Sequence, residues 1–278
     1  AKNAGDTAMV RRVAQRYLDI VARASQADRR NPFYQAFGAT AAYTAMILKD
    51  ETALLDSLRH GSAGYIAFKR AAWAKASGER GEALRFPIGE PAAPVEGTVW
   101  FGRDDASAPR PSKGKLGLVL FLDYNCRGMS NGRCWPAYAS LRRLAHRFPT
   151  LQVTVVARTH GFFSEMAPPT PAEEAQVLHE WWQEFHRLPG ALAVTATDFW
   201  RLDDPDRRRI DRPTPNETHY SFGRSWELKP GMAFLVDRDG TILEVGTLGL
   251  KDSMGVPDVE MQFARLIEIL LGRQAASR

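Results

Sequence analysis

The stretch that decides the fold is residues 116–148, LGLVLFLDYNCRGMSNGRCWPAYASLRRLAHRF. It carries both cysteines of the 278-residue chain, Cys126 and Cys134, with seven residues between them. An apolar run that favours a buried strand leads into the first cysteine, and an amphipathic helical pattern follows the second. A helix N-terminus favours thiolate over thiol, and the thiolate is the reactive form. The stretch therefore predicts a strand, a cysteine-bearing loop and a helix suited to thiol–disulfide chemistry.

The dipeptide Trp135-Pro136 predicts where this helix starts. The residue before a proline disfavours the helical conformation, whereas proline suits the first helical turn. A helix that began at Asn131 would carry Pro136 in its interior, at a cost of about 3 kcal/mol. We therefore expect the helix to start near Pro136, with Cys134 at its N-terminus, where the pKa of the thiol would be lowered.

The composition is that of a globular protein, with 44% hydrophobic and 25% charged residues. No apolar run approaches the roughly 20 residues needed to span a bilayer. The net charge is +5, but both signs are spread along the chain. The densest charged run, residues 203–212, mixes signs and predicts a solvated loop, so nucleic acid is not an expected partner. The sequence starts at Ala1 without an apolar leader, which is typical of a mature or trimmed product.

The pattern changes near residue 86, and we expect two parts. Residues 1–85 predict an all-helical N-terminal region. Apolar residues recur at helical spacing from Met9 to Val21, and Asn31-Pro32 resembles an N-cap followed by a first-turn proline. Shorter helical segments follow at residues 54–58 and 65–73.

Residues 86–278 predict strands alternating with helices, which is an α/β class with a mixed sheet flanked by helices. The expected strands are residues 95–101, 117–124, 151–157, 191–197, 232–236 and 241–245. Helices are expected after Cys134, from Pro171 to Leu188 and over residues 259–270. Asp239-Gly240 predicts a two-residue turn that joins the last two strands in a hairpin.

This second part resembles the thioredoxin-fold proteins of the TlpA/ResA type, which are extracytoplasmic thiol–disulfide oxidoreductases. The resemblance covers about residues 86–275 and is carried by four pieces. They are residues 89–94 with EGTVWF, the run LVLFLDY, the spacing from Cys134 into its helix, and FLVDRDGTI at residues 234–242. It implies a thioredoxin-like domain after residue 86, and the resemblance does not extend to the helical region before it.

The resemblance implies that Cys126 and Cys134 are the catalytic pair, although the spacing is C-x7-C in place of C-x-x-C. In the family register Cys134 takes the second position, and Asn131 falls where the attacking cysteine stands. Two orders remain open: Cys126 attacks and Cys134 resolves, or Cys134 attacks and Cys126 resolves. Asp123 is a candidate for assisting proton transfer, or else a strand-end aspartate that bonds the backbone.

The family also has a cis-proline three residues before the phenylalanine of its hairpin. Gly231 occupies that position here, and Pro230 lies one residue further back. A one-residue bulge would restore Pro230 to the site. The implied substrate groove is lined by Tyr124, Trp135, Trp226 and Pro230.

Two functions follow from different roles of the cysteine pair. In the first, the protein is an oxidoreductase that exchanges electrons with the thiols and disulfides of other proteins. In the second, it is a redox-inactive binding or scaffold protein. Its Cys126–Cys134 disulfide then closes a short loop and stabilises the fold by roughly 2.5 kcal/mol.

We expect an extracytoplasmic protein, periplasmic or secreted, with peripheral or no membrane contact. Its N-terminal helices would dock a protein partner or dimerise. No cofactor and no metal are predicted. His179 and His186 are seven residues apart, whereas a zinc protease motif requires histidines four apart.

Overall fold

The computed structural model describes residues 7–23, 39–77, 87–92, 95, 99–102, 113–122, 134–158, 171–183, 190–195, 231–248 and 259–276. The chain divides into two compact units. The first comprises Ala1–Gly89, Asp252–Pro257 and Ala264–Arg278, and the second comprises Glu90–Lys251 and Asp258–Phe263. The last helix, α8 (Val259–Ala276), thus contributes residues to both.

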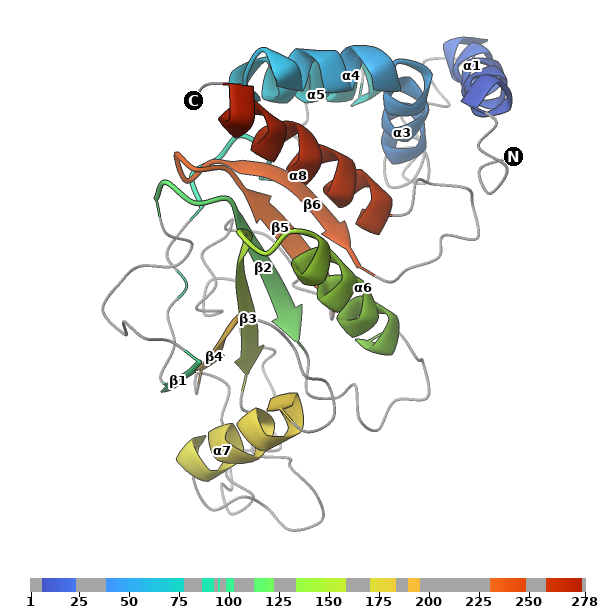
Figure 1. Ribbon diagram of the computed structural model, residues 1–278. Coiled ribbons are helices and arrows are strands. Elements are labelled where there is room, and N and C mark those ends of the chain that lie inside the picture. Colours follow the sequence, from blue (N-terminus) through green and yellow to red (C-terminus); the bar gives the residue numbers. More distant parts are fainter. Residues whose placement is uncertain are drawn as a thin grey trace, which may run out of the picture. The chain divides into compact units, whose positions relative to one another are not determined.

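The N-terminal part of the first unit is helical, as predicted. Its described helices are α1 (Thr7–Arg23), α3 (Ala39–Lys49), α4 (Glu51–Arg59) and α5 (Ser62–Ser77) (Figure 1). Tyr43 meets Trp73 edge to face with ring centroids 5.6 Å apart, and both side chains are buried. Leu58 of α4 and Tyr65 of α5 are fully buried. The predicted N-cap at Asn31-Pro32 lies outside the described residues.

The second unit contains a six-stranded mixed sheet with the order β1-β4-β3-β2-β5-β6 (Figure 1). The strands are β1 (Val99–Phe101), β2 (Gly117–Leu122), β3 (Gln152–Arg158), β4 (Ala191–Thr195), β5 (Met232–Val236) and β6 (Ile242–Thr247). β2, β3 and β4 are parallel, whereas β1 runs antiparallel to β4 and β5 runs antiparallel to both β2 and β6. The helices that intervene are α6 (Cys134–Arg147) and α7 (Pro171–Trp181). The predicted order of strands and helices is confirmed.

Burial explains why the central strands read as continuous apolar runs. Leu118, Val119 and Leu120 of β2 are fully buried, and Phe121 is nearly so. Neighbouring residues of a strand point to opposite faces, so both faces of β2 are covered. Phe121 meets Phe234 of β5 edge to face with ring centroids 5.5 Å apart, which ties β2 to its neighbour β5.

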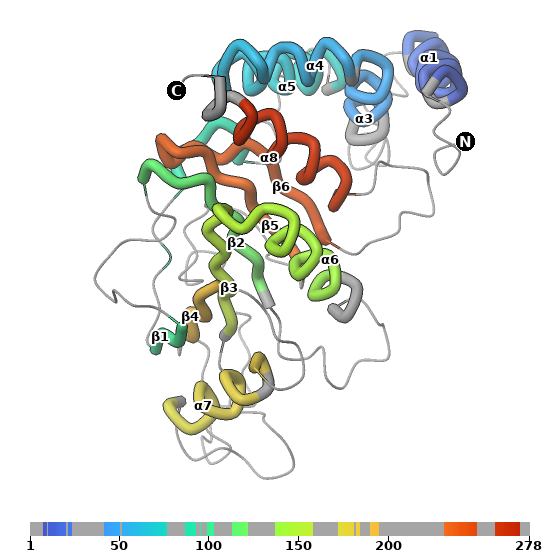
Figure 2. The backbone as a smooth tube through the Cα atoms, in the orientation of Figure 1, coloured from blue at the N-terminus to red at the C-terminus, as the bar shows by residue number. Residues whose placement is uncertain are grey.

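Helix α6 carries the apolar stripe that the sequence predicts. It runs alongside β2 and β5 (Figure 2). Tyr138, Leu141 and Leu144 are almost completely buried, and Phe148 is buried just after the helix ends. Ala145, which the predicted stripe includes, is only half-buried. The helix is therefore held by a narrow apolar face.

The turn between β5 and β6 differs from the prediction. The N–H of Gly240 donates to the carbonyl of Asp237 at 3.0 Å, so Arg238 and Asp239 are the central residues. Gly240 follows them with φ +93, and the ladder shifts by one residue near Val236. This is a three-residue loop with a glycine bulge, not the expected two-residue turn, because such a loop needs the left-handed conformation at its last residue, which Gly240 supplies.

The segment before β1 is tied to the same hairpin. Pro91 forms an isolated bridge with Thr241, and the N–H of Ala92 donates to the carbonyl of Gly240 at 2.7 Å. Strand β1 itself is shorter than expected, since Val95 lies outside it. β1 pairs with β4 over its three residues, from Val99 opposite Val194 to Phe101 opposite Leu192.

Replacing Gly190 with alanine tests the tight entry into β4. Gly190 has φ +88, and an added Cβ would overlap the carbonyl oxygen of Val153. We expect Gly190→Ala to lower the free energy of unfolding by about 3 kcal/mol or more. Gly114→Ala is the matched control, because Gly114 has φ +83 but its Cβ would meet no atom of the described residues within 4 Å. Its cost should be about 1 kcal/mol. Urea unfolding measures both, and equal losses would contradict the overlap.

Candidate active site

The N-terminus of α6 is the centre of the candidate site, and Cys134 is the first residue of the helix. This agrees with the start that Trp135-Pro136 predicts. The first turn of α6 contains no acidic residue, and the last turn carries His146 and Arg147. The positive end of the helix dipole at Cys134 is therefore not neutralised by a carboxylate of the helix's own first turn. An anion is favoured at this position, and a thiolate is one.

Most of the other predicted site residues lie outside the part of the chain that the structure describes. Cys126, Asp123 and Tyr124 fall in residues 123–133, and Trp226 and Pro230 fall in residues 196–230. Trp135 belongs to α6 by its backbone, but its side chain and that of Cys134 are not described. The structure does define both ends of the cysteine-bearing loop. These are Leu122, at the end of β2, and Cys134.

Gly231 brings the start of β5 against both ends of that loop. Its N–H donates to the carbonyl of Phe121 at 3.0 Å, one residue before β2 ends. A Cβ placed on Gly231 would lie 3.3 Å from the Cβ of Ala137, in the first turn of α6. Its φ of +79 is in the region that favours glycine. The chain thus approaches the N-terminal turn of α6 closely at this glycine.

The ladder between β2 and β5 is displaced by one residue at the same place. Leu120 faces Ala233, so Phe121 would face Met232 in an unbroken ladder. Instead the carbonyl of Phe121 accepts its hydrogen bond from Gly231. A one-residue displacement beside the end of β2 is the kind of irregularity that a bulge produces.

A polar clamp holds the middle of α6 to the start of α8. The hydroxyl of Ser140 donates to Glu260 at 2.7 Å, and Nε of Arg143 donates to the other carboxylate oxygen at 2.7 Å. A second nitrogen of Arg143 also contacts Glu260, so the pairing is bidentate. Next to it, Val259 packs so closely on Gly246 of β6 that a Cβ there would lie 2.5 Å from Val259.

The clamp changes the acidity of Glu260. Burial by itself would raise the pKa of this carboxyl, but the hydrogen bonds from Arg143 and Ser140 and the charge of Arg143 outweigh it. The pKa of Glu260 therefore lies below its ordinary value. The ionised form is the one that the folded protein prefers.

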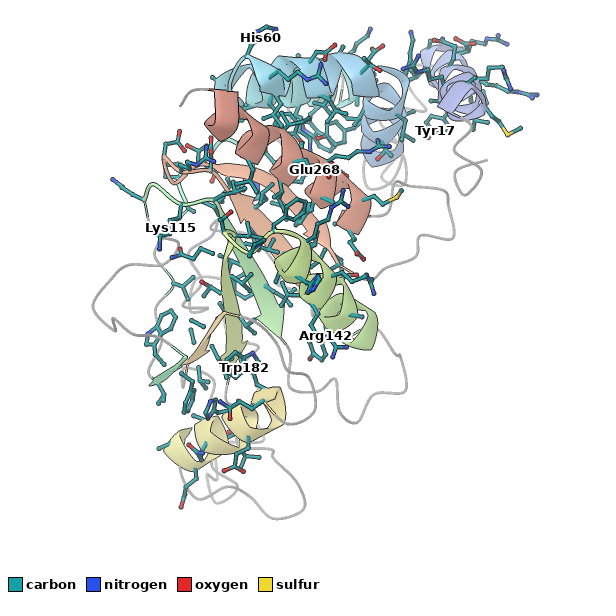
Figure 3. The ribbon with its side chains drawn as sticks, in the orientation of Figure 1. Tyr17, His60, Lys115, Arg142, Trp182 and Glu268 are labelled. Carbon is teal, nitrogen blue, oxygen red and sulfur yellow. The ribbon has the colours of Figure 1, made fainter. Side chains whose placement is uncertain are left out.

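A separate aromatic cluster surrounds His179 of α7. Its ring stacks on Phe101 of β1 with centroids 4.0 Å apart, and the ring centroid of Trp182, which Figure 3 labels, lies 5.6 Å from that of His179. Burial lowers the pKa of His179, and the charge of Glu180 offsets part of that effect. His186 lies outside the described residues, and among those described no group of three His, Cys, Asp or Glu side chains is placed to hold a metal.

Comparison with known proteins shows that this chain is similar to several solved structures. No family model matches the chain, and no curated protein matches it. StoA from Bacillus subtilis matches with 12% identity and a TM-score of 0.35, over 64% of this chain and 100% of that chain. A putative protein disulfide isomerase from Bacteroides thetaiotaomicron matches with 13% identity and a TM-score of 0.39, over 70% of this chain and 97% of that chain. BsSco, a member of the Sco family of cytochrome c oxidase assembly proteins, matches with 13% identity and a TM-score of 0.38, over 66% of this chain and 96% of that chain.

Similarity of this size assigns no role to any residue, and the class of fold follows from the topology itself. The parallel β2-α6-β3 unit shares one sheet with the antiparallel β5-β6 hairpin, and a closing helix, α8, follows. This is a thioredoxin-like arrangement, as the sequence predicts. No helix within the described residues is long and apolar enough to cross a membrane.

The sequence does not predict the clamp between α6 and Glu260 or the close approach of Gly231 to Ala137. Ser140 and Arg143 are three residues apart on α6, a spacing that places them on one side of the helix. Their partner Glu260 is more than a hundred residues further along the chain, and no local pattern points to it. The sequence places Gly231 at the position of the family's cis-proline, but it does not predict that Gly231 packs on α6.

The pH dependence of stability tests the clamp. A carboxyl whose pKa is lowered by folding stabilises the protein above its unfolded pKa, and this contribution is lost as the pH falls through the folded pKa. We expect Glu260→Gln to lower the free energy of unfolding by about 1 kcal/mol at neutral pH. The difference from the parent should shrink below about pH 4. Glu90→Gln, a change at an exposed glutamate, is the control, and its effect on the free energy of unfolding at neutral pH should be smaller. If the free energies of unfolding of Glu260→Gln and the parent differ by the same amount at every pH, the clamp does not depend on the ionised carboxylate of Glu260.

Proposed function

We propose that this protein is a thiol–disulfide oxidoreductase that acts on the cysteines of other proteins through Cys126 and Cys134. The observation that supports this most strongly is the position of Cys134 as the first residue of α6, with no acidic residue in the first turn. A cysteine there has its thiolate stabilised by the helix dipole. The thioredoxin-like topology provides a strand end and a helix start on either side of the loop.

The reaction proceeds by two successive thiol–disulfide exchanges. The thiolate of one cysteine attacks a disulfide of the substrate, forms a mixed disulfide and releases one substrate sulfur as a thiolate. The second cysteine then loses its proton and attacks the enzyme's sulfur in the mixed disulfide. The second substrate sulfur leaves as a thiolate, which is protonated. The substrate gains two electrons, and Cys126 and Cys134 end as a disulfide. The reverse sequence oxidises a dithiol substrate.

We place the substrate groove beside Gly231. This residue touches the first turn of α6 and bonds to Phe121 near the end of β2, and Pro230 precedes it directly in the chain. The one-residue displacement of the ladder at Gly231 supports Pro230 as the groove's proline. Tyr124, Trp135 and Trp226 are the proposed walls. Asp123 follows the last residue of β2 and is the proposed proton acceptor for the resolving cysteine.

We also propose an extracytoplasmic location, with protein thiols and disulfides as partners. The even pair of cysteines suits an oxidising compartment. In this proposal residues 1–85 form a separate helical region, and residues 86–278 form the redox domain.

The reduction potential of the cysteine pair separates the oxidoreductase from a scaffold with a structural disulfide. We expect equilibration in glutathione or dithiothreitol buffers, with alkylation and mass readout, to give a value between about −120 and −270 mV. A value below about −300 mV, or a bond that is reduced only on unfolding, would make the disulfide structural and overturn the proposed activity.

Two serine variants test the roles of the cysteines. Cys134→Ser should abolish reduction of a protein disulfide such as that of insulin, because neither order of attack can be completed. Cys126→Ser should also lose turnover. The variant that retains the attacking cysteine should trap a mixed disulfide with the substrate, visible by mass and released by dithiothreitol. Clear turnover by Cys134→Ser would count against the mechanism.

A further inference from the structure

Helix α1 presents an exposed apolar stripe. Met9, Val13 and Ile20 are 42%, 64% and 59% exposed, and each is a large hydrophobic residue. Their positions, separated by four and then seven residues, fall on one side of an α-helix. Three such side chains in one line on one helix are more than scattered surface hydrophobics.

An arginine stands three residues after each of these apolar residues. The pairs are Met9 with Arg12, Val13 with Arg16 and Ile20 with Arg23. Residues three apart are neighbours on a helix surface, so the three arginines form a second row parallel to the apolar one. All three arginines are exposed. The outer face of α1 is therefore an apolar row flanked along its length by a basic row.

The opposite face of α1 is the one that joins the helix to its unit. Ala14 is buried, and Arg11 donates to the hydroxyl of Thr52 on α4 at 2.8 Å. The helix packs on α3. Figure 3 shows nitrogen-tipped side chains of α1 projecting on the side away from α3. The outer face is thus available while the inner face holds the helix in place.

We propose that the outer face of α1 binds an anionic lipid surface, with Met9, Val13 and Ile20 inserted at the interface and Arg12, Arg16 and Arg23 on the headgroups. Long arginine stems lie along apolar surface while their charged ends reach outward. A helix with an apolar row and a basic row is the arrangement that binds an interface between lipid and water. Anionic lipid complements the charge of the arginine row.

The size of the face favours lipid over a protein partner. A stable protein interface buries about 800 Å² on each side and involves some 20 residues, far more than three apolar side chains supply. Antiparallel pairing with a second copy would also bring two arginine rows together. The acidic residue nearest the basic row is Asp19, which accepts a hydrogen bond from Gln15 at 2.6 Å. This inference is independent of the redox proposal, because it uses neither cysteine.

Co-sedimentation with vesicles tests the proposal. The full chain is incubated with vesicles of phosphatidylcholine containing about one third phosphatidylglycerol, and with vesicles of phosphatidylcholine alone. We expect binding to the anionic vesicles, a strong decrease at high salt, and little binding to the neutral ones. Arg12→Gln with Arg16→Gln should weaken binding about 25-fold, which is about fivefold for each arginine. Val13→Ser with Ile20→Ser should weaken it roughly tenfold or more.

The matched control is Arg59→Gln with Arg142→Gln, which removes two exposed arginines outside α1. It should leave vesicle affinity within about twofold of the parent, although the net charge changes equally. Absence of binding to anionic vesicles, equal binding to neutral ones, or an equal loss in the control would overturn the proposal. So would a dimer, measured by sedimentation equilibrium, that Val13→Ser with Ile20→Ser dissociates. Circular dichroism of each variant checks that α1 remains folded.

Discussion

The burial of β2 at the centre of the sheet is the interaction on which the candidate site depends. The strand pairs with β3 on one side and with β5 on the other, and Leu118, Val119 and Leu120 are fully buried. Each such side chain stabilises the fold by about 1.5–3 kcal/mol. A shift of register by one residue would exchange the two faces of the strand and lose that stabilisation. The position of Leu122, and so the point where the cysteine-bearing loop leaves the sheet, is fixed by this burial.

Helix α6 is held in two chemically different ways, and together they set where its N-terminus lies. The apolar stripe fixes the face of the helix that meets the rest of the unit, but it would tolerate some sliding along the axis. The bidentate pairing of Arg143 with Glu260 opposes sliding, because two oxygens must meet two donors at once. The glycine at position 231 then allows the chain before β5 to approach Ala137 without a Cβ between them. These contacts, and not helix propensity alone, therefore set where the N-terminal turn of α6 lies.

The sequence predicts what is local and apolar, and it does not predict what is distant and polar. The run before Cys126 and the stripe after Cys134 identify β2 and α6, and Met232–Val236 is matched residue for residue as β5. Pro136 indicates the helix start because proline acts on its immediate neighbours. The prediction of a two-residue hairpin turn is wrong, since Asp-Gly suits both such a turn and the glycine bulge that is present. The partnership of Ser140 and Glu260 depends on the whole fold, so no window of sequence contains it.

The unusual spacing of the cysteines bears less on redox chemistry than it first suggests. Closing a flexible loop costs about 0.6 kcal/mol for each doubling of its length. A disulfide between Cys126 and Cys134, as proposed, would close a ring of nine residues, slightly more than twice the four of a C-x-x-C ring. The difference is about 0.7 kcal/mol, or roughly 15 mV for a two-electron couple. Working thiol–disulfide proteins span about 150 mV, from −270 to −120 mV. In the proposed redox pair, the length of the loop therefore accounts for only a small part of the range of potentials that such proteins span.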